Sequence, residues 1–154
     1  MLSDIYSALS AFIVTVPHGG QVYSITARDL GDLKNVYDAV DLPTRVLSPF
    51  HDFEATVTPR TLSGLRVTNE WEVTDMCLWK AATQDTGIGA VSPFAVAYIH
   101  AYSALLGENL HITSQAIIER WKFKPAVYPF PRGDSATMYY GILTIINVKE
   151  LENL

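Results

Sequence analysis

The segment Ala136–Lys149, with the sequence ATMYYGILTIINVK, constrains the fold of this chain more than any other feature. Alternate residues form two faces, and both are apolar: Met138, Tyr140, Ile142, Thr144, Ile146 and Val148 on one, and Tyr139, Leu143 and Ile145 on the other. A strand with two apolar faces has to be covered on both sides, so we expect a long central strand. Gly141 in its interior predicts a bulge or the close approach of another backbone.

Length and composition indicate one globular domain over residues 1–154. Hydrophobic residues make up 49% of the chain and charged residues 18%, which excludes a disordered protein. The net charge of -5 argues against a dedicated nucleic-acid binder, whose surface would be basic. A single cysteine, Cys77, cannot form an internal disulfide or a thiolate metal site, and a reducing cytoplasm is the expected compartment.

Neither a secretory signal nor a membrane span is expected. No Lys or Arg precedes the first apolar stretch, as a secretory signal would require. Residues 86–107 carry no formal charge, but Pro93 and Gly107 limit the predicted helix to about 14 residues, or roughly 21 Å, against roughly 30 Å of hydrocarbon. We therefore expect a buried helix and no membrane partner.

Hydrophobic periodicity and the positions of Pro and Gly predict the order of the elements. We expect two helices, one from Ser3 to Val16 and one capped by Ser92 and ended by Gly107. The predicted strands are Gln21–Ser24, Arg45–Leu47, Val67–Lys80, Ile117–Lys124 and the C-terminal segment, with a proline-rich connection before the last; residues 26–40 are ambiguous. This order predicts an α+β fold in which a mostly antiparallel sheet packs against two α-helices.

Residues 48–64 show little hydrophobic periodicity and contain Pro49, Pro59 and Gly64. A stretch of this length without regular structure is uncommon in a compact domain unless it has a function. We expect a long extended loop or arm on the surface.

Asp75 is the one candidate for acid or base chemistry. Alternation places it on the same strand face as Trp71, Val73 and Cys77. A carboxylate there is either a group with a raised pKa that acts in catalysis or a hydrogen-bonded structural residue, and we favour the structural reading. Cys77 has no neighbouring His on its strand and is expected to be an inert buried thiol.

Other possible sites are weak. The glycine-rich turn at residues 86–90 lacks the full dinucleotide fingerprint and the phosphate-loop lysine. The four histidines are scattered, without a pair at metal-ligand spacing. The cations Arg120, Lys122 and Lys124 alternate with aromatic residues, so the two kinds of side chain fall on opposite faces. We expect no catalytic residue, cofactor or metal.

The strand Trp71–Leu78, the helix around Tyr98 and Tyr102, and the C-terminal strand from Tyr139 to Glu150 occur in an order that resembles the tail terminator and head–tail joining (neck) proteins of long-tailed bacteriophages. The segment Leu42–Leu47 and the N-terminal helix stand in the matching order, so the similarity spans most of the chain. Residues 19–40 fit less clearly.

The resemblance implies a structural virion protein, assembled in the host cytoplasm, that forms a ring, commonly of six copies. Such a ring caps the tail tube and joins it to the head–tail connector. The partners implied are the chain itself, the tail tube protein and the connector protein, while DNA passes through the lumen without specific binding. The predicted arm would contact a neighbouring subunit through Phe50, Phe53, Pro59, Arg60 and Leu62.

Two other functions stay open. A portal-side head-completion or adaptor protein would have a mostly helical fold. A small α+β enzyme using Asp75 would have a concave pocket around this residue with a second titratable group nearby.

Overall fold

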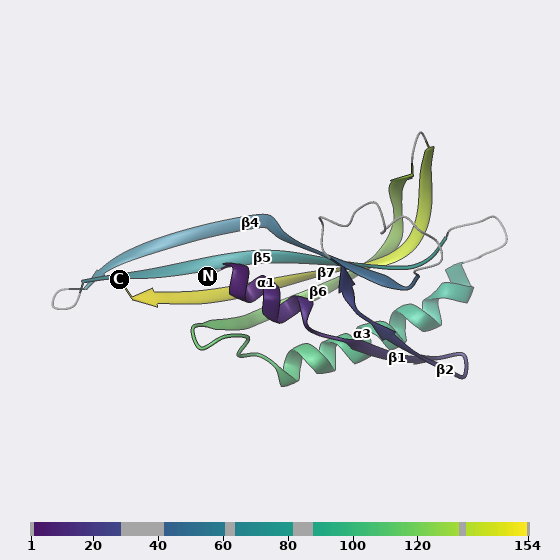
Figure 1. The fold of residues 1–154 in the computed structure, drawn as a ribbon, viewed down its shortest axis with the longest axis horizontal. Helices are drawn as coiled ribbons and strands as arrows, with labels where there is room; N and C mark the ends of the chain where they lie inside the picture. The colour runs from purple at the N-terminus through teal and green to yellow at the C-terminus, as the bar shows by residue number, and fades with distance from the viewer. Residues whose placement is uncertain (1, 29–41, 61–63, 82–87, 133–134, 154) are drawn as a thin grey trace.

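The computed structural model describes residues 2–28, 42–60, 64–81, 88–132 and 135–153. The protein is elongated, and its two described helices lie on the same side of a long sheet (Figure 1). In chain order the elements are α1 (Leu2–Ser10), β1 (Val14–His18), β2 (Gln21–Ile25), β3 (Ala27–Arg28), β4 (Thr44–Arg60), β5 (Gly64–Ala81), α3 (Ile88–Glu108), β6 (Ala116–Arg132) and β7 (Ser135–Asn153).

Within the described ranges, the main sheet has five strands in the order β3-β4-β5-β7-β6, and β1 and β2 form a separate two-stranded sheet. The predicted α+β fold, in which a β-sheet packs against two helices, is confirmed. The main sheet is mixed, because β3 pairs with β4 in parallel whereas β4 with β5, β5 with β7, and β6 with β7 are antiparallel.

The prediction of an interior strand near the C-terminus is confirmed by β7, which lies between β5 and β6. Ile146 on one face is fully buried, and Ile145 on the other is only 4% exposed. Gly141 lies opposite Leu78, and the next β5 residue in the register is Lys80, so the expected bulge is in the neighbouring strand at Trp79.

The main hydrophobic core lies between the sheet and the layer formed by α1, α3 and the β1–β2 hairpin (Figure 1). Its fully buried members come from every one of these elements and include Ile5, Leu9, Val16, Ile25, Leu47, Val73, Phe94, Tyr98, Leu106 and Ile146. Phe94, Tyr98, Tyr102 and Leu106 recur every four positions along α3 and form the surface that this helix packs against the sheet.

The N-terminal helix is shorter than predicted, because α1 ends at Ser10 and Val14–His18 forms β1. Val14 and Val16 are buried while Thr15 and Pro17 are exposed, which is the two-residue period of a strand. Gly19 and Gly20 follow with φ of 60° and 78°, the positive values that a two-residue type I′ hairpin turn needs at both positions. The strand predicted at residues 21–24 is β2.

The second helix is longer than predicted. It begins at Ile88, so Ser92 is not its N-cap and Pro93 lies inside it. A proline in the second turn removes only one backbone hydrogen bond, which explains why the helix continues through it. Among the described residues, no helix combines the length and apolar character needed to cross a membrane.

The segment predicted as a long loop is mostly a strand. Residues 48–60 belong to β4 and pair with β5, with an irregularity between Ser48 and Asp52. We call residues 54–60 of β4 and 64–70 of β5 the arm; it projects away from α3 along the long axis of the molecule (Figure 1). The expected extended arm is therefore a β-hairpin, and the loop prediction was wrong over residues 48–60.

The predicted proline-rich connection at residues 125–132 is also a strand. It continues β6 to Arg132, which pairs with Ser135 of β7. Proline cannot donate to a ladder and is tolerated here because β6 lies at the margin of the sheet.

Candidate functional site

A buried charge cluster joins the neighbouring strands β4 and β5 to helix α3. Arg45 of β4 and Asp75 of β5 are both 0% exposed, and the Arg45 guanidinium donates from Nε and Nη2 to Asp75 Oδ2 at 2.9 and 2.7 Å. Tyr102 of α3 donates its hydroxyl to the same carboxylate oxygen at 2.5 Å and accepts from Arg45 Nη2 at 3.1 Å. The guanidinium carbon also lies 4.8 Å from the centre of the Tyr102 ring, a cation–π distance.

The same guanidinium holds the C-terminal end of α1. Its Nη1 donates to the backbone oxygen of Phe12 at 2.6 Å, and its Nη2 lies 3.4 Å from the backbone oxygen of Leu9. The last carbonyls of a helix carry partial negative charge and have no partner within the helix. Arg45 thus satisfies the end of α1 while it pairs with Asp75.

The electrostatics of the cluster keep Arg45 charged. Burial alone would lower the pKa of the guanidinium, but the Asp75 carboxylate, followed by Tyr102 and Tyr98, outweighs it, and the pKa is raised above the ordinary value for arginine. Burial and Asp75 raise the pKa of the Tyr102 hydroxyl well above its usual range, so Tyr102 acts as a neutral donor.

This geometry suits Asp75 to a structural role. Its Oδ2 accepts three hydrogen bonds, from Arg45 Nε, Arg45 Nη2 and Tyr102 Oη. The side chain is closed off from solvent, and it lines neither of the two hollows described below. The expectation that Asp75 is a hydrogen-bonded carboxylate on the core face is confirmed.

Cys77 lies beside this cluster on β5 and is fully buried. Burial, and then the negative charge of Asp75, raise the pKa of the Cys77 thiol above its ordinary value. Since the thiolate is the reactive form, both effects suppress its chemistry.

We therefore expect the native protein at pH 8 to react with an aromatic disulfide reagent at least roughly 10³-fold more slowly than the denatured chain, because reaction requires unfolding. The measurement is the time course of thiol release across a urea series, in which the rate should follow the unfolded fraction. A Cys77→Ala variant gives the background. Stoichiometric labelling of the folded protein within seconds would show that the thiol is accessible.

A second buried carboxylate fixes the arm to β7. Glu150 is 0% exposed, and its Oε2 accepts from Asn69 Nδ2 and from Trp71 Nε1, both at 3.3 Å. Burial opposes the charge of Glu150, but hydrogen bonds that include these two outweigh it and lower the pKa of the carboxyl. The root of the arm is therefore held by polar contacts as well as by the ladder.

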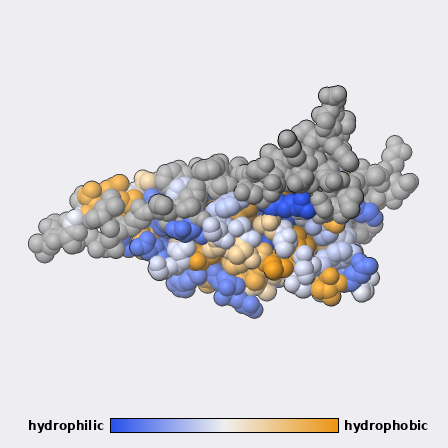
Figure 2. All heavy atoms as spheres, viewed as in Figure 1, coloured by the Kyte–Doolittle hydropathy of each residue, from blue (hydrophilic) through white to orange (hydrophobic). Residues whose placement is uncertain are grey.

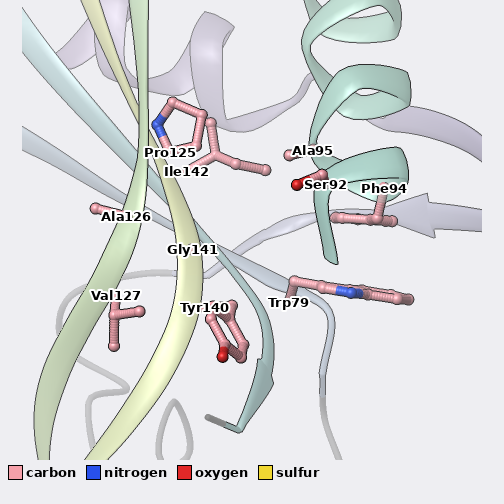
Figure 3. Close-up of a pocket in the computed structure, with 10 residues that line it drawn as sticks. All are labelled: Trp79, Ser92, Phe94, Ala95, Pro125, Ala126, Val127, Tyr140, Gly141 and Ile142. Atoms are coloured by element: carbon pink, nitrogen blue, oxygen red, sulfur yellow. The ribbon is translucent and has the colours of Figure 1, made fainter. Parts of the chain in front are cut away.

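An apolar pocket of about 140 Å³ lies between the N-terminal part of α3 and the strands β6 and β7 (Figure 3). One wall is a stack of Trp79 on Phe94, with ring centres 3.7 Å apart and planes 7° apart. The other lining residues are Ser92, Ala95, Pro125, Ala126, Val127, Tyr140, Gly141 and Ile142. The lining contains no carboxylate, imidazole or thiol, and the volume is small beside the roughly 300–1,000 Å³ of small-molecule sites. It suits one apolar side chain.

A more open hollow of about 410 Å³ lies near the N-terminal end of β6 and contains His111. Its other lining residues, Ser114, Gln115, Ala116, Ile117 and Leu151, provide no carboxylate or thiol beside the imidazole. His18 instead packs edge-on against Trp79 and Phe94, at 5.7 Å between ring centres in each case, and His100 is exposed on α3.

Within the described ranges, no group of three or more His, Cys, Asp or Glu residues is arranged to hold a metal ion. Part of the glycine-rich turn, residues 86 and 87, lies outside the described residues, and residues 88–90 form the first turn of α3.

The predicted interface residues fall on the β4 strand rather than on a loop. Phe53 pairs with Trp71, Pro59 with Leu65, and Arg60 with Gly64, while Phe50 lies in the irregular part of the ladder. Leu62 lies outside the described residues. Sequence reasoning missed two features: Arg45 as the partner of Asp75, and the exposed arm residues Val57 and Leu65, at 55% and 44% exposure. A lone arginine within an apolar strand was the available signal for the first.

No protein-family model matches this chain, and no curated protein matches it.

Proposed function

We propose that this protein is a structural virion subunit that assembles into a ring, hexameric as in the family it resembles, at the end of a long phage tail. The observation that carries the proposal is the arm, a β-hairpin that runs beyond both described helices and exposes Val57 and Leu65 at 55% and 44%. Exposed apolar side chains on a projecting hairpin are typical of a surface that is covered by another chain. Figure 2 shows apolar residues gathered at that end of the molecule.

The margin of the arm supports a contact with another subunit. β3 pairs with β4 only at Arg45 and Val46, so among the described strands the rest of β4 has a neighbour on one side only. Open sheet margins are sites of association unless they are protected. An element that reaches from one copy to a different surface of the next makes a head-to-tail contact, and such contacts repeat into rings.

The interior of the molecule supports a scaffold role. The two residues that the sequence offered for acid–base or thiol chemistry, Asp75 and Cys77, are buried, and Asp75 is fixed to Arg45 and Tyr102. The hydrogen bonds from Asn69 and Trp71 to Glu150 hold the root of the arm in a fixed direction, as a subunit contact requires. In this proposal no catalytic residue is needed.

The proposal also implies which proteins the ring contacts and where in the virion it lies. The ring would contact the tail tube protein on one side and the head–tail connector on the other, within the virion neck. A net charge of -5 suits a lumen through which DNA moves without adhering. The β-rich fold gives no support to a mostly helical portal-side adaptor, and the burial of Asp75 gives none to a small enzyme that uses it.

The test is self-association of the purified protein, alone and with tail tubes, by sedimentation velocity and electron microscopy. We expect closed rings for the unmodified protein. Replacing Val57 or Leu65 by Asp should weaken association at least tenfold, since truncating or charging a central contact costs about 2 kcal/mol or more. Val22→Asp is the matched control, because Val22 is 68% exposed on the β1–β2 hairpin, outside the arm.

These outcomes separate the alternatives. A protein that stays monomeric in both settings would contradict the ring. Rings formed equally well by the Val57→Asp and Leu65→Asp variants would show that the arm is not the contact.

A further inference from the structure

The sheet face opposite α1 and α3, here called the outer face, carries charges of opposite sign at its two margins. The strand register assigns residues to this face: Glu70 pairs with Glu54, and Thr74 pairs with Ile145, which in turn pairs with Lys122. Because directly opposed residues share a face and every second residue returns to it, Glu54, Glu70 and Lys122 all lie on the outer face.

The acidic margin is formed by the arm. Glu54 of β4 and Glu70 of β5 are directly opposite each other and both exposed. Two like charges in this position disfavour the hairpin that contains them. Neither carboxylate forms an ion pair with another described residue, although Lys149 is the register neighbour of Glu70 on β7. Among the described residues, this acidic pair therefore has no cation on its β4 side.

The basic margin is β6. Arg120, Lys122 and Lys124 are exposed, and their register partners on β7 are Asn147, Ile145 and Leu143. Arg120 Nε donates to Asn147 Oδ1 at 3.2 Å. These three residues, the basic row, thus face uncharged neighbours across the ladder.

Glu54 and the basic row lie on strands that are not neighbours in the sheet. Glu54 on β4 is separated from β6 by β5 and β7, about 14 Å at ordinary strand spacing, whereas Glu70 on β5 is separated from β6 by β7 alone. β4 and β6 lie on opposite sides of the β5–β7 pair (Figure 1). When copies are placed side by side, the β4 margin of one copy meets the β6 margin of the next, and opposite charges at these margins are complementary. Such head-to-tail contacts form a ring when the rotation between copies closes.

We propose that the acidic pair Glu54–Glu70 of one copy docks against the basic row Arg120–Lys122–Lys124 of the next copy. This inference rests on the proposed ring and names the second surface of its repeating contact. Val57 and Leu65 lie on the opposite face of the arm from Glu54 and Glu70, so the two charge sets form a contact of their own, which sets the partner surface and its register. The basic row is matched to an acidic surface on the same chain, which favours a second copy over nucleic acid as its occupant.

The experiment is a charge swap between Glu54→Lys and Lys122→Glu, read by sedimentation velocity at low and high salt. Each single variant should weaken association about tenfold or more, and the double variant should recover most of it, because the reversed charges meet again between copies. Association of the unmodified protein should fall as salt rises. Glu108→Lys is the control, since it makes the same charge change at an exposed residue at the end of α3.

A second readout separates docking from folding. Glu54→Lys places a cation opposite Glu70 in the isolated monomer, so its melting temperature should stay equal or rise while assembly weakens. A purely structural role for Glu54 would move both in the same direction and would overturn the inference.

Failure of the inference is distinguishable from failure of the ring. If the unmodified protein assembles and both single variants assemble like Glu108→Lys, the ring stands and the charge contact is wrong. If the unmodified protein does not assemble at all, the ring itself fails. If the unmodified protein binds duplex DNA in a gel-shift experiment and the Lys122→Glu variant does not, the basic row binds nucleic acid and the charge contact is wrong.

Discussion

Asp75→Asn should lower the free energy of unfolding by about 3–5 kcal/mol, the usual effect of removing one partner of a buried ion pair. The change leaves the Arg45 guanidinium charged and 0% exposed, with its compensating anion gone. The measurement is urea unfolding followed by circular dichroism. At temperatures where the variant stays folded, assembly should be largely intact, because the residue is proposed to act through stability alone.

An exposed ion pair provides the matched control. Glu119 pairs with Lys149 at 3.6 Å, with 46% and 36% of the respective side chains exposed. Glu119→Gln should change stability by less than about 1 kcal/mol. Replacing both Arg45 and Asp75 by Leu should cost less than Asp75→Asn, since no buried charge is left alone. Lost assembly at an unchanged melting temperature would contradict a structural role for Asp75.

Phe94→Ala should destabilise the protein by about 3–5 kcal/mol, within the range for truncating a buried aromatic residue. Phe94 is fully buried and stacks on Trp79, and it makes edge contacts with His18 and Tyr23 of the β1–β2 hairpin. The variant loses the central ring between α3, β5 and this hairpin. Hydrogen exchange should therefore show the largest loss of protection in residues 14–25.

Val96→Ala is the control for Phe94, because Val96 lies two residues further along α3 and is 52% exposed. Its effect should stay within about 0.5 kcal/mol. Uniform loss of protection across the sheet, with the β1–β2 hairpin unaffected, would show that Phe94 does not hold that hairpin.

Strands with a clear local pattern of apolar residues on one or both faces could be predicted from the sequence. β7 is apolar on both faces and was predicted as interior; β5 alternates with a clear apolar face and was predicted nearly to its ends. The partial burial of Trp71 and Trp79 and the full burial of Val73 follow from that alternation. In both strands the periodic signal spans ten residues or more.

Elements that depend on distant partners could not be predicted. Residues 13–16 fit a helical period as well as a strand period, and only the Gly19–Gly20 turn and the pairing with β2 decide for the strand. In β4, polar residues and Pro49 hide the alternation of apolar and polar side chains, and the strand forms because its backbone pairs with β5. The pairing of Arg45 with Asp75 joins residues thirty positions apart, so it depends on a register that local pattern does not contain.

The place of β7 in the sheet has a consequence for synthesis. Both of its neighbours, β5 and β6, precede it in the chain, so on the ribosome they emerge without the strand that joins them. Until β7 is translated, each exposes a long unpaired margin that invites wrong pairing with other nascent chains. Only a chain in which β7 has been translated can therefore complete the sheet and form a surface that spans it.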